Sequence, residues 1–310
     1  MPEITDFKPI GVFPALPTPL NSDGSINYTA MENFIEYLED GGVHGIVPAG
    51  CTGHAASLGD RGGTEEHVRF VKKVSEMTDL PVIAGDGINT TEQTIDLAAK
   101  VEEEADIDAH LMISPYQNCP PQDMIVEHYK EISKHVEKPI VAYNVPGRTG
   151  RNIEAETTLR LAEEVPGVVG IKEASGSHSQ IRKISRGLDS KGIDDFFLGS
   201  GTDAINDYIF EQGGTFAITV SGNVHPEKVV EVWEEAYENG NMQRAYEINQ
   251  ELMPLHEAMF QSGEKNPMSV QYALNLLGFD FGTPRAPLNR KPLKENREEL
   301  KSVLKSYDLL

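Results

Sequence analysis

Hydrophobic and polar positions alternate along the chain in a unit that recurs about every 30 residues in its first half. Each unit starts with a short apolar run and ends in a polar, often glycine-containing tail. Runs this short, bounded by turn residues, are typical of buried strands. We count eight: "GVFPALPTP" from Gly11, "GIVPAGCTG" from Gly45, "PVIAGDGIN" from Pro81, "AHLMISPY" from Ala109, "PIVAYNVPGRTG" from Pro139, "VVGIKEASG" from Val168, "DFFLGSGTD" from Asp195 and "GTFAITVSGN" from Gly214.

Most of these runs are separated by stretches in which apolar residues recur every three to four positions, as on one face of a helix. The stretches are "YTAMENFIEYLEDGG", "TEEHVRFVKKVSEM", "TTEQTIDLAAKVEEE", "PQDMIVEHYKEISKHV", "EAETTLRLAEEV", "HSQIRKISRGL" and "TDAINDYIFEQGG". We expect Thr64 to cap the second of them. Strands that alternate with helices of this length predict an α/β fold, a parallel (β/α)₈ TIM barrel. An open doubly wound sheet is the alternative, but no G-x-G-x-x-G follows the first strand.

After residue 225 the pattern becomes helical throughout. "PEKVVEVWEEAYENG" is expected to complete the barrel, and three more helices are predicted: "MQRAYEINQELMPLHEAMFQSG", "NPMSVQYALNLLG" and "LKENREELKSVLKSYDLL". The sequence therefore predicts a catalytic barrel over residues 1–235 and a C-terminal helical region over residues 236–310. We expect this region to pack on the barrel.

Composition narrows the class of protein. The chain has 310 residues, and 39% of them are hydrophobic, enough for a sizeable core. No stretch approaches the roughly 18 apolar residues of a membrane span, and the N-terminus does not resemble a signal peptide, so a cytoplasmic protein is expected. The net charge of -22 argues against a nucleic-acid partner, and it suits either salt adaptation or solubility. Only Cys51 and Cys119 occur, which provide no disulfide framework.

Candidate chemistry is expected where the strands end, because active sites of such barrels lie at the C-terminal ends of the strands. Lys172 sits near the end of the sixth apolar run. An apolar wall disfavours the charged ammonium, and a neutral amine can form a Schiff base with a carbonyl substrate. The alternative is a lysine paired with an acid such as Glu173. That residue is next along the strand and is expected to point to the opposite side.

Two further residues follow the fifth run. Tyr143 lies near its end, beside the strand of Lys172 in a barrel, and is either a proton-transfer group or a packing tyrosine. Arg148, in "PGRTG", carries a fork of donors suited to a carboxylate. The alternative for Arg148 is an ordinary surface arginine on a loop.

The second run ends in "AGCTG", which places Cys51 and Thr52 between glycines. Successive N–H groups there can form an anion nest for the carboxylate of a 2-oxo acid, and either side chain can join a proton relay. A tight turn with an ordinary thiol is the alternative. His54 and His110 are the candidate metal ligands. Because no H-x-H, H-E-x-x-H or Cys–His cluster occurs, we interpret both as core or solvated histidines and predict no metal.

Taken together, these motifs resemble the dihydrodipicolinate synthase / N-acetylneuraminate lyase family of class I, Schiff-base aldolases. The resemblance covers nearly the whole chain. Its most specific motifs are "AYNVPGRTG" and "GIKEASG", which place Lys172 29 residues after Tyr143. The resemblance implies a (β/α)₈ barrel with a C-terminal helical domain, no cofactor, and a homotetramer built as a dimer of dimers.

The resemblance also implies roles for individual residues. Lys172 would form the imine with pyruvate, and Tyr143 would transfer protons. Arg148 is similar to the arginine that binds the carboxylate of aspartate semialdehyde in the synthase branch, which acts in lysine biosynthesis. The remaining expected site residues bind pyruvate, relay protons or line the pocket: Cys51, Thr52, Gly53, Tyr116, Gly201 and Ile218.

Three departures leave other functions open. Cys51 replaces the usual threonine of the turn, His54 replaces the usual glutamate, and Gln117 replaces a second tyrosine that in the synthase reaches a neighbouring subunit's relay. Residues 59–63 also resemble an inserted loop near the lysine-feedback region of some synthases, so the sequence gives no support for feedback inhibition. The alternatives are an aldolase or dehydratase acting on a 2-keto-3-deoxy sugar acid, and a paralogue that binds a 2-oxo acid without catalysis.

Overall fold

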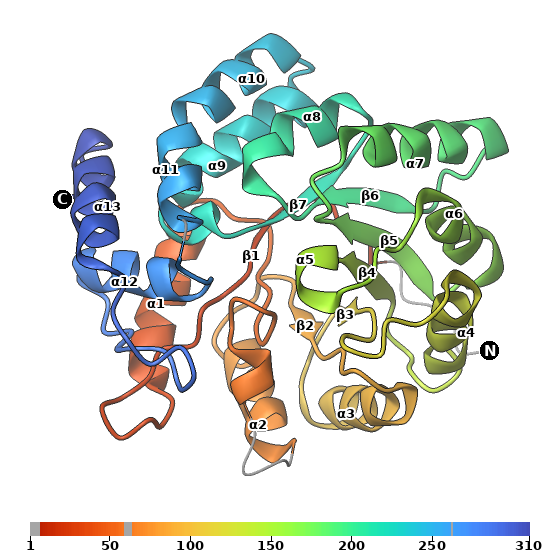
Figure 1. Cartoon of the computed structure of the whole chain (residues 1–310), viewed down its shortest axis with the longest axis horizontal. Helices are drawn as coiled ribbons and strands as arrows, with labels where there is room; N and C mark the ends of the chain where they lie inside the picture. The colour runs from red at the N-terminus through yellow and green to blue at the C-terminus, as the bar shows by residue number, and fades with distance from the viewer. Residues whose placement is uncertain (1–6, 59–63, 262) are drawn as a thin grey trace.

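The computed structural model describes residues 7–58, 64–261 and 263–310, and in this part of the chain the strands form one curled parallel sheet (Figure 1). The neighbouring strands follow the order β1-β7-β6-β5-β4-β3-β2. Their bounds are β1 (Gly11–Pro14), β2 (Ile83–Gly85), β3 (Ala109–Ile113), β4 (Ile140–Asn144), β5 (Val168–Glu173), β6 (Phe197–Ser200) and β7 (Phe216–Thr219).

The predicted second strand is reduced to two isolated bridges, so seven regular strands are described where we expected eight. Val47 pairs with Ala15 after β1, and Ile46 pairs with Val82 before β2. These two residues thus lie between the edge strands of the sheet and close it into a barrel. At Pro48 the ladder lacks one hydrogen bond because proline has no N–H to donate, although the Pro48 carbonyl still accepts from the Gly85 amide at 2.9 Å. The predicted barrel is confirmed, and the prediction of a regular second strand was wrong.

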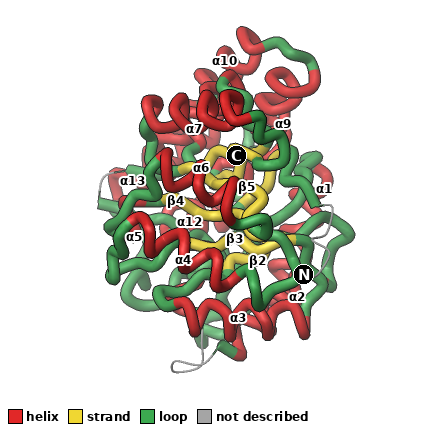
Figure 2. The backbone as a smooth tube through the Cα atoms, turned by 90° about the vertical axis from the view of Figure 1, so that its right-hand side faces the viewer, coloured by secondary structure: helices red, strands yellow, loops and turns green. Residues whose placement is uncertain are grey.

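The barrel helices surround the sheet, as the tube in Figure 2 shows from the side. They are α1 (Tyr28–Asp40), α2 (Glu65–Ser75), α3 (Thr91–Glu104), α4 (Gln122–Ile132), α6 (Ala155–Glu164), α7 (His178–Lys191), α8 (Asn206–Glu211) and α9 (Pro226–Trp233). Shorter helices lie among them: the α-helix α5 (Pro146–Thr149), the 3₁₀ helices η1 (Ala55–Ser57), η2 (Asp203–Ile205) and η3 (Ser221–Asn223), and the π-helix η4 (Glu234–Glu238).

Local sequence explains where several of these helices begin. The side chain of Thr90 accepts from the Gln93 amide at the start of α3, and Ser177 does the same for Gln180 at the start of α7. Thr64 precedes α2 as predicted, but its side chain makes no capping hydrogen bond. The acids at the start of α2 still favour its N-terminus electrostatically.

Alternation along the strands produces two apolar layers. Phe13, Val141 and Ile218 are among the buried residues inside the barrel. Val12, Ala142 and other residues between them face outward and pack under the helices. Because successive strand residues point to opposite faces, each strand serves both layers at once.

The C-terminal helices gather beside α1 and α9 (Figure 1). They are α10 (Met242–Glu251), α11 (Met253–Met259), α12 (Met268–Leu276) and α13 (Lys294–Ser306). Phe279 and Phe281 meet the ring of Phe34 on α1 edge-on, with centroids 5.4 and 5.0 Å apart. This region therefore packs on the barrel. The boundary at residue 235 stays a prediction.

One predicted C-terminal helix, beginning at residue 242, is divided into α10 and α11. Pro254 lies at the start of α11, where it cannot donate to the preceding turn. In the described part of the chain, none of the helices combines the length and apolar character needed to cross a membrane.

Candidate active site

Lys172 projects into the barrel near the end of β5. It is paired in register with Tyr143 of β4, and its Nζ lies 4.3 Å from the centroid of the tyrosine ring. Only 5% of the Lys172 surface is exposed. The neighbouring Glu173 points outward, as predicted, and accepts from Asn144 Nδ2 and Gln180 Nε2, both at 2.8 Å. Glu173 is therefore not the counter-ion of Lys172.

The surroundings of Lys172 favour a neutral amine. Burial lowers the pKa of Lys172 to about 8, against an ordinary value of 10.5. Cys51 and Asp203 oppose this lowering of the pKa, while the Arg148 guanidinium adds to it. A buried amine with a lowered pKa is what an imine-forming nucleophile requires.

Tyr143 remains a protonated phenol. Burial, followed by the nearby Cys51, raises its pKa well above the usual value. The tyrosine side chain is 7% exposed and belongs to the cluster inside the barrel. A neutral phenol whose ring lies next to the Lys172 amine is placed to exchange a proton with a group attached to that amine.

Gly201 and Ile218 border the same space. A Cβ at Gly201 would lie 2.9 Å from both Cε and Cγ of Lys172 and 2.7 Å from Cβ of Ala174. Glycine at this position therefore leaves room for the lysine side chain. Ile218 of β7 is 1% exposed and belongs to the same inner apolar cluster as Tyr143.

The turn that contains Cys51, Thr52 and Gly53 replaces the end of the missing strand. Ala49 and His54, which flank it, have φ of 55° and 63°. Non-glycine residues in this left-handed region carry strain, which clusters at functional sites. The Gly53 amide donates to the Gly50 carbonyl at 3.0 Å, so it is not free for an anion nest.

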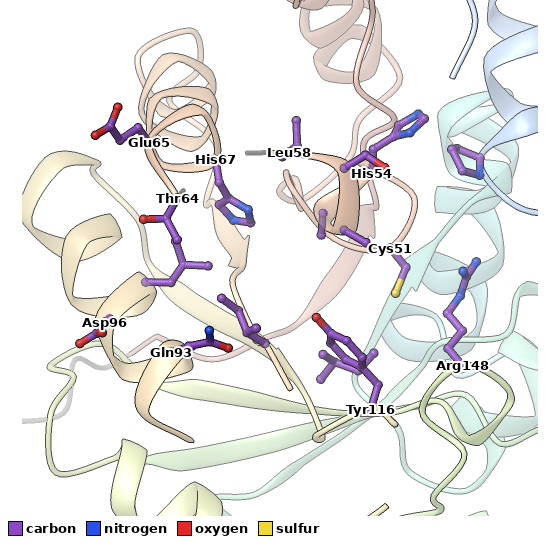
Figure 3. Close-up of a pocket in the computed structure, with 18 of the residues that line it drawn as sticks. Cys51, His54, Leu58, Thr64, Glu65, His67, Gln93, Asp96, Tyr116 and Arg148 are labelled. Atoms are coloured by element: carbon purple, nitrogen blue, oxygen red, sulfur yellow. The ribbon is translucent and has the colours of Figure 1, made fainter. Parts of the chain in front are cut away.

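A cavity of about 830 Å³ opens beside this turn (Figure 3). Cys51, Tyr116 and Arg148 lie toward one end of it, and Thr64, Glu65 and Asp96 toward the other. Lys172 and Tyr143 are not among its lining residues. Cys51 connects the two sets, because it lines the cavity and acts electrostatically on both Lys172 and Tyr143.

The two histidines named as candidate metal ligands are both buried, and His54 also lines the cavity. His54 Nε2 lies 3.2 Å from Gln271 Oε1, and burial lowers its pKa to about 4. His110 lies between two carboxylates, at 2.5 Å from Asp86 and 2.8 Å from Glu102. Within the described residues, no group of three or more His, Cys, Asp or Glu side chains is arranged to hold a metal ion.

Two residues that the sequence did not single out also reach the site. Asp203 is 2% exposed, accepts from the amides of Val220 and Ser221, and raises the pKa of Lys172. It belongs to a strand tail already expected to face the site. Asn266 donates through Nδ2 to Thr52 Oγ1 at 2.8 Å. Its contact with the site is separated by 214 residues, and no local pattern signals it.

A parallel barrel with a buried lysine amine against a tyrosine, near the C-terminal ends of adjacent strands, defines a class I, Schiff-base-forming lyase. The model of the Dihydrodipicolinate synthetase family matches residues 8–307. The 4-hydroxy-tetrahydrodipicolinate synthase of Archaeoglobus fulgidus is 41% identical over 300 residues, which cover 97% of this chain and 99% of that protein.

Solved structures agree. The dihydrodipicolinate synthase of Thermotoga maritima superposes with a TM-score of 0.91 at 36% identity, over 97% of this chain and 99% of that one. A structure described as the first monomeric dihydrodipicolinate synthase variant gives the same TM-score and identity, over 97% and 98%. The chain belongs to the Dihydrodipicolinate synthetase family, and it is therefore an enzyme of the class I aldolase and lyase type.

The loop at residues 59–63, which we interpreted as an insertion near a feedback region, lies outside the described residues.

Proposed function

We propose that this chain is a 4-hydroxy-tetrahydrodipicolinate synthase, which condenses pyruvate with aspartate semialdehyde in lysine biosynthesis. The observation that carries the proposal is the buried Lys172 amine held against the Tyr143 ring at 4.3 Å, with Arg148 on the cavity next to it. Curated relatives support the same activity, because proteins of this name match the chain over 94 to 99% of their own length.

In the first half of the reaction, the lone pair of Lys172 Nζ attacks the keto carbon of pyruvate. Tyr143 passes both amine protons in turn to the carbonyl oxygen: the first transfer gives the carbinolamine, and the second lets water leave as the C=N bond of the imine forms. A methyl proton then moves to the imine nitrogen, which gives the enamine. The enamine carbon adds to the aldehyde of the second substrate, and the N–H proton passes to the aldehyde oxygen. Ile218 and the other apolar side chains around the imine exclude competing water.

The carboxylate of pyruvate is placed at the turn beside Lys172. The amides of Cys51 and Thr52 donate to no described residue, and the Thr52 hydroxyl is 2.8 Å from Asn266 Nδ2. These donors suit a carboxylate. The Gly53 amide is used within the turn, so in this proposal Gly53 contributes its lack of a side chain instead. A Cβ there would lie 2.9 Å from the Leu16 carbonyl and from the Ala49 amide.

Arg148 and Tyr116 are assigned to the second substrate. Both line the cavity, and Arg148 Nη2 donates to the Asn266 carbonyl at 3.3 Å, which leaves its other donors for a carboxylate. Gln117 is exposed and has a φ of 66°, and an amide cannot replace a phenol in a proton relay. We therefore assign the relay to Tyr143 and Cys51, whose thiol interacts electrostatically with the phenol.

The test is turnover by the purified protein. Pyruvate and aspartate semialdehyde should both be consumed at neutral pH, measured with and without high salt. A panel of 2-keto-3-deoxy sugar acids distinguishes the alternative aldolase or dehydratase. Arg148→Ala should raise KM for aspartate semialdehyde strongly. If this variant turns over the semialdehyde as the parent does, the substrate assignment is wrong.

A homotetramer and a cytoplasmic location remain predictions of the same proposal. Because a related structure is described as monomeric, the family resemblance does not fix the assembly. Sedimentation velocity across protein concentrations measures it directly.

A further inference from the structure

The turn that contains Cys51, Thr52 and Gly53 is held from outside the barrel by the segment that leads into α12. Asn266 is 8% exposed and contacts two site residues. Its Nδ2 donates to Thr52 Oγ1 at 2.8 Å, and its backbone carbonyl accepts from Arg148 Nη2 at 3.3 Å. Asn266 also lines the cavity. One residue of the C-terminal region thus touches both sides of the substrate space.

The direction of the Asn266–Thr52 hydrogen bond determines what the hydroxyl can do. A threonine hydroxyl has one proton to donate and two lone pairs that accept. The amide N–H occupies a lone pair, so the hydroxyl proton stays available for an acceptor in the site. The other orientation of the amide would offer Oδ1 to that proton and remove it from the substrate.

A second set of contacts supports the same turn from α12. Gln271 Nε2 donates to the Thr18 carbonyl at 2.7 Å, and Thr18 Oγ1 donates to the Gly53 carbonyl at 2.6 Å. Gln271 Oε1 also meets His54 Nε2. These contacts fix the backbone of the turn, whereas the side chain of Asn266 acts on the hydroxyl of Thr52 alone.

We infer that Asn266 is a positioning residue that holds the Thr52 hydroxyl as a hydrogen-bond donor to the carboxylate of pyruvate on Lys172. The inference rests on the proposed function only for the identity of pyruvate as the first substrate. It gives the C-terminal helical region a part in substrate binding, through Thr52. Asn266 acts through Thr52 and does not touch the reacting atoms.

The experiment measures trapping of pyruvate on the intact protein by borohydride, with mass spectrometry of the Lys172 adduct. The readout is the pyruvate concentration that gives half-maximal trapping. Asn266→Leu keeps a similar size and adds no charge. Without Asn266 Nδ2 the Thr52 hydroxyl is no longer held as a donor to the pyruvate carboxylate. The half-maximal concentration should therefore rise about tenfold or more, as expected when a hydrogen bond to a charged group is lost. Thr52→Val should raise it by a similar factor.

Combining the two changes tests whether Asn266 acts through Thr52. In the Thr52→Val background, Asn266→Leu should change the half-maximal concentration by less than about twofold, because the hydroxyl that it orients is gone. The pH midpoint of trapping should stay that of the parent. Asn275→Ala is the matched control. Asn275 lies on α12, and its side chain bonds only to backbone groups of residues 271, 281 and 282. Its replacement should lower thermal stability without changing trapping.

Equal effects of Asn266→Leu with and without Thr52 would overturn the inference, and so would an unchanged half-maximal concentration in the single variant. Failure of the proposed function is separate. If pyruvate is trapped but aspartate semialdehyde is not consumed, the synthase assignment fails and the role of Asn266 is still tested.

Discussion

The lowered pKa of Lys172 leads to a prediction about how imine formation depends on pH. An ordinary lysine with a pKa of 10.5 is neutral in only about one molecule in 3,000 at pH 7, whereas a pKa of about 8 leaves about one in ten neutral. The difference is about 300-fold in reactive amine, equivalent to about 3 kcal/mol. The rate of pyruvate trapping should therefore rise about tenfold per pH unit below pH 8 and level off above it.

Two variants should shift the midpoint of this rise in trapping rate with pH in opposite directions. Asp203 carries a negative charge that stabilises the ammonium, so Asp203→Asn should lower the midpoint. Asparagine keeps a side-chain oxygen, which can still accept the hydrogen bonds that the amides of Val220 and Ser221 donate to Asp203. Arg148 carries a positive charge that destabilises the ammonium, so Arg148→Ala should raise the midpoint.

The assay is the initial rate of borohydride-trapped adduct between pH 6 and 10 at low pyruvate, with no second substrate present. Under these conditions the rise with pH reports groups of the free enzyme, and the binding role proposed for Arg148 does not enter. A midpoint near the ordinary lysine value, or a shift of both variants in the same direction, would refute the electrostatic account of this site.

Three further predictions follow from single contacts. Tyr143→Phe keeps the ring against Lys172 Nζ but removes the proton, so trapping should slow by about 10² while the adduct still forms on Lys172. Gly201→Ala places a Cβ within 2.9 Å of the Lys172 side chain and should slow trapping by about 10² without altering the far-ultraviolet circular dichroism. Burial opposes a charged His110, but Asp86 and Glu102 outweigh it and raise the pKa of His110 to about 9. The stabilisation of the folded state by charged His110 is therefore complete below pH 6.5, the pKa of histidine in the unfolded chain, and is lost as the pH rises through about 9. Urea unfolding should show a loss of about 3 kcal/mol over that range. His110→Asn should abolish this pH step, and a step of equal size in the variant would contradict the assignment.

The sequence determined the parts of the site that lie on single strands. Lys172 and Tyr143 each end a recognisable apolar run, and consecutive βα units place such ends side by side at one rim. The opposite directions of Lys172 and Glu173 followed from the two-residue period of a strand. These features depend on the local sequence pattern and on the right-handed connection of parallel βα units. Neither requires contacts with distant parts of the chain.

The barrel's second strand shows where local pattern was insufficient. "GIVPAG" has the composition of a strand, yet the chain forms only isolated bridges at Ile46 and Val47, and Pro48 has no N–H to add to the ladder. The turn that follows is held mainly by residues far away in sequence. Those contacts, and not strand propensity, set its shape.

Only the tertiary structure showed which distant groups complete the site. Asn266 meets Thr52 across 214 residues. Asp203 was visible in a strand tail, but its effect on Lys172 depends on where β6 and β7 end relative to β5. No periodicity encodes such contacts, because they arise when separate elements pack and their side chains share one space. The local sequence thus determined the positions of Lys172 and Tyr143. The packing of distant elements determined which groups shift the pKa of Lys172 and orient the Thr52 hydroxyl.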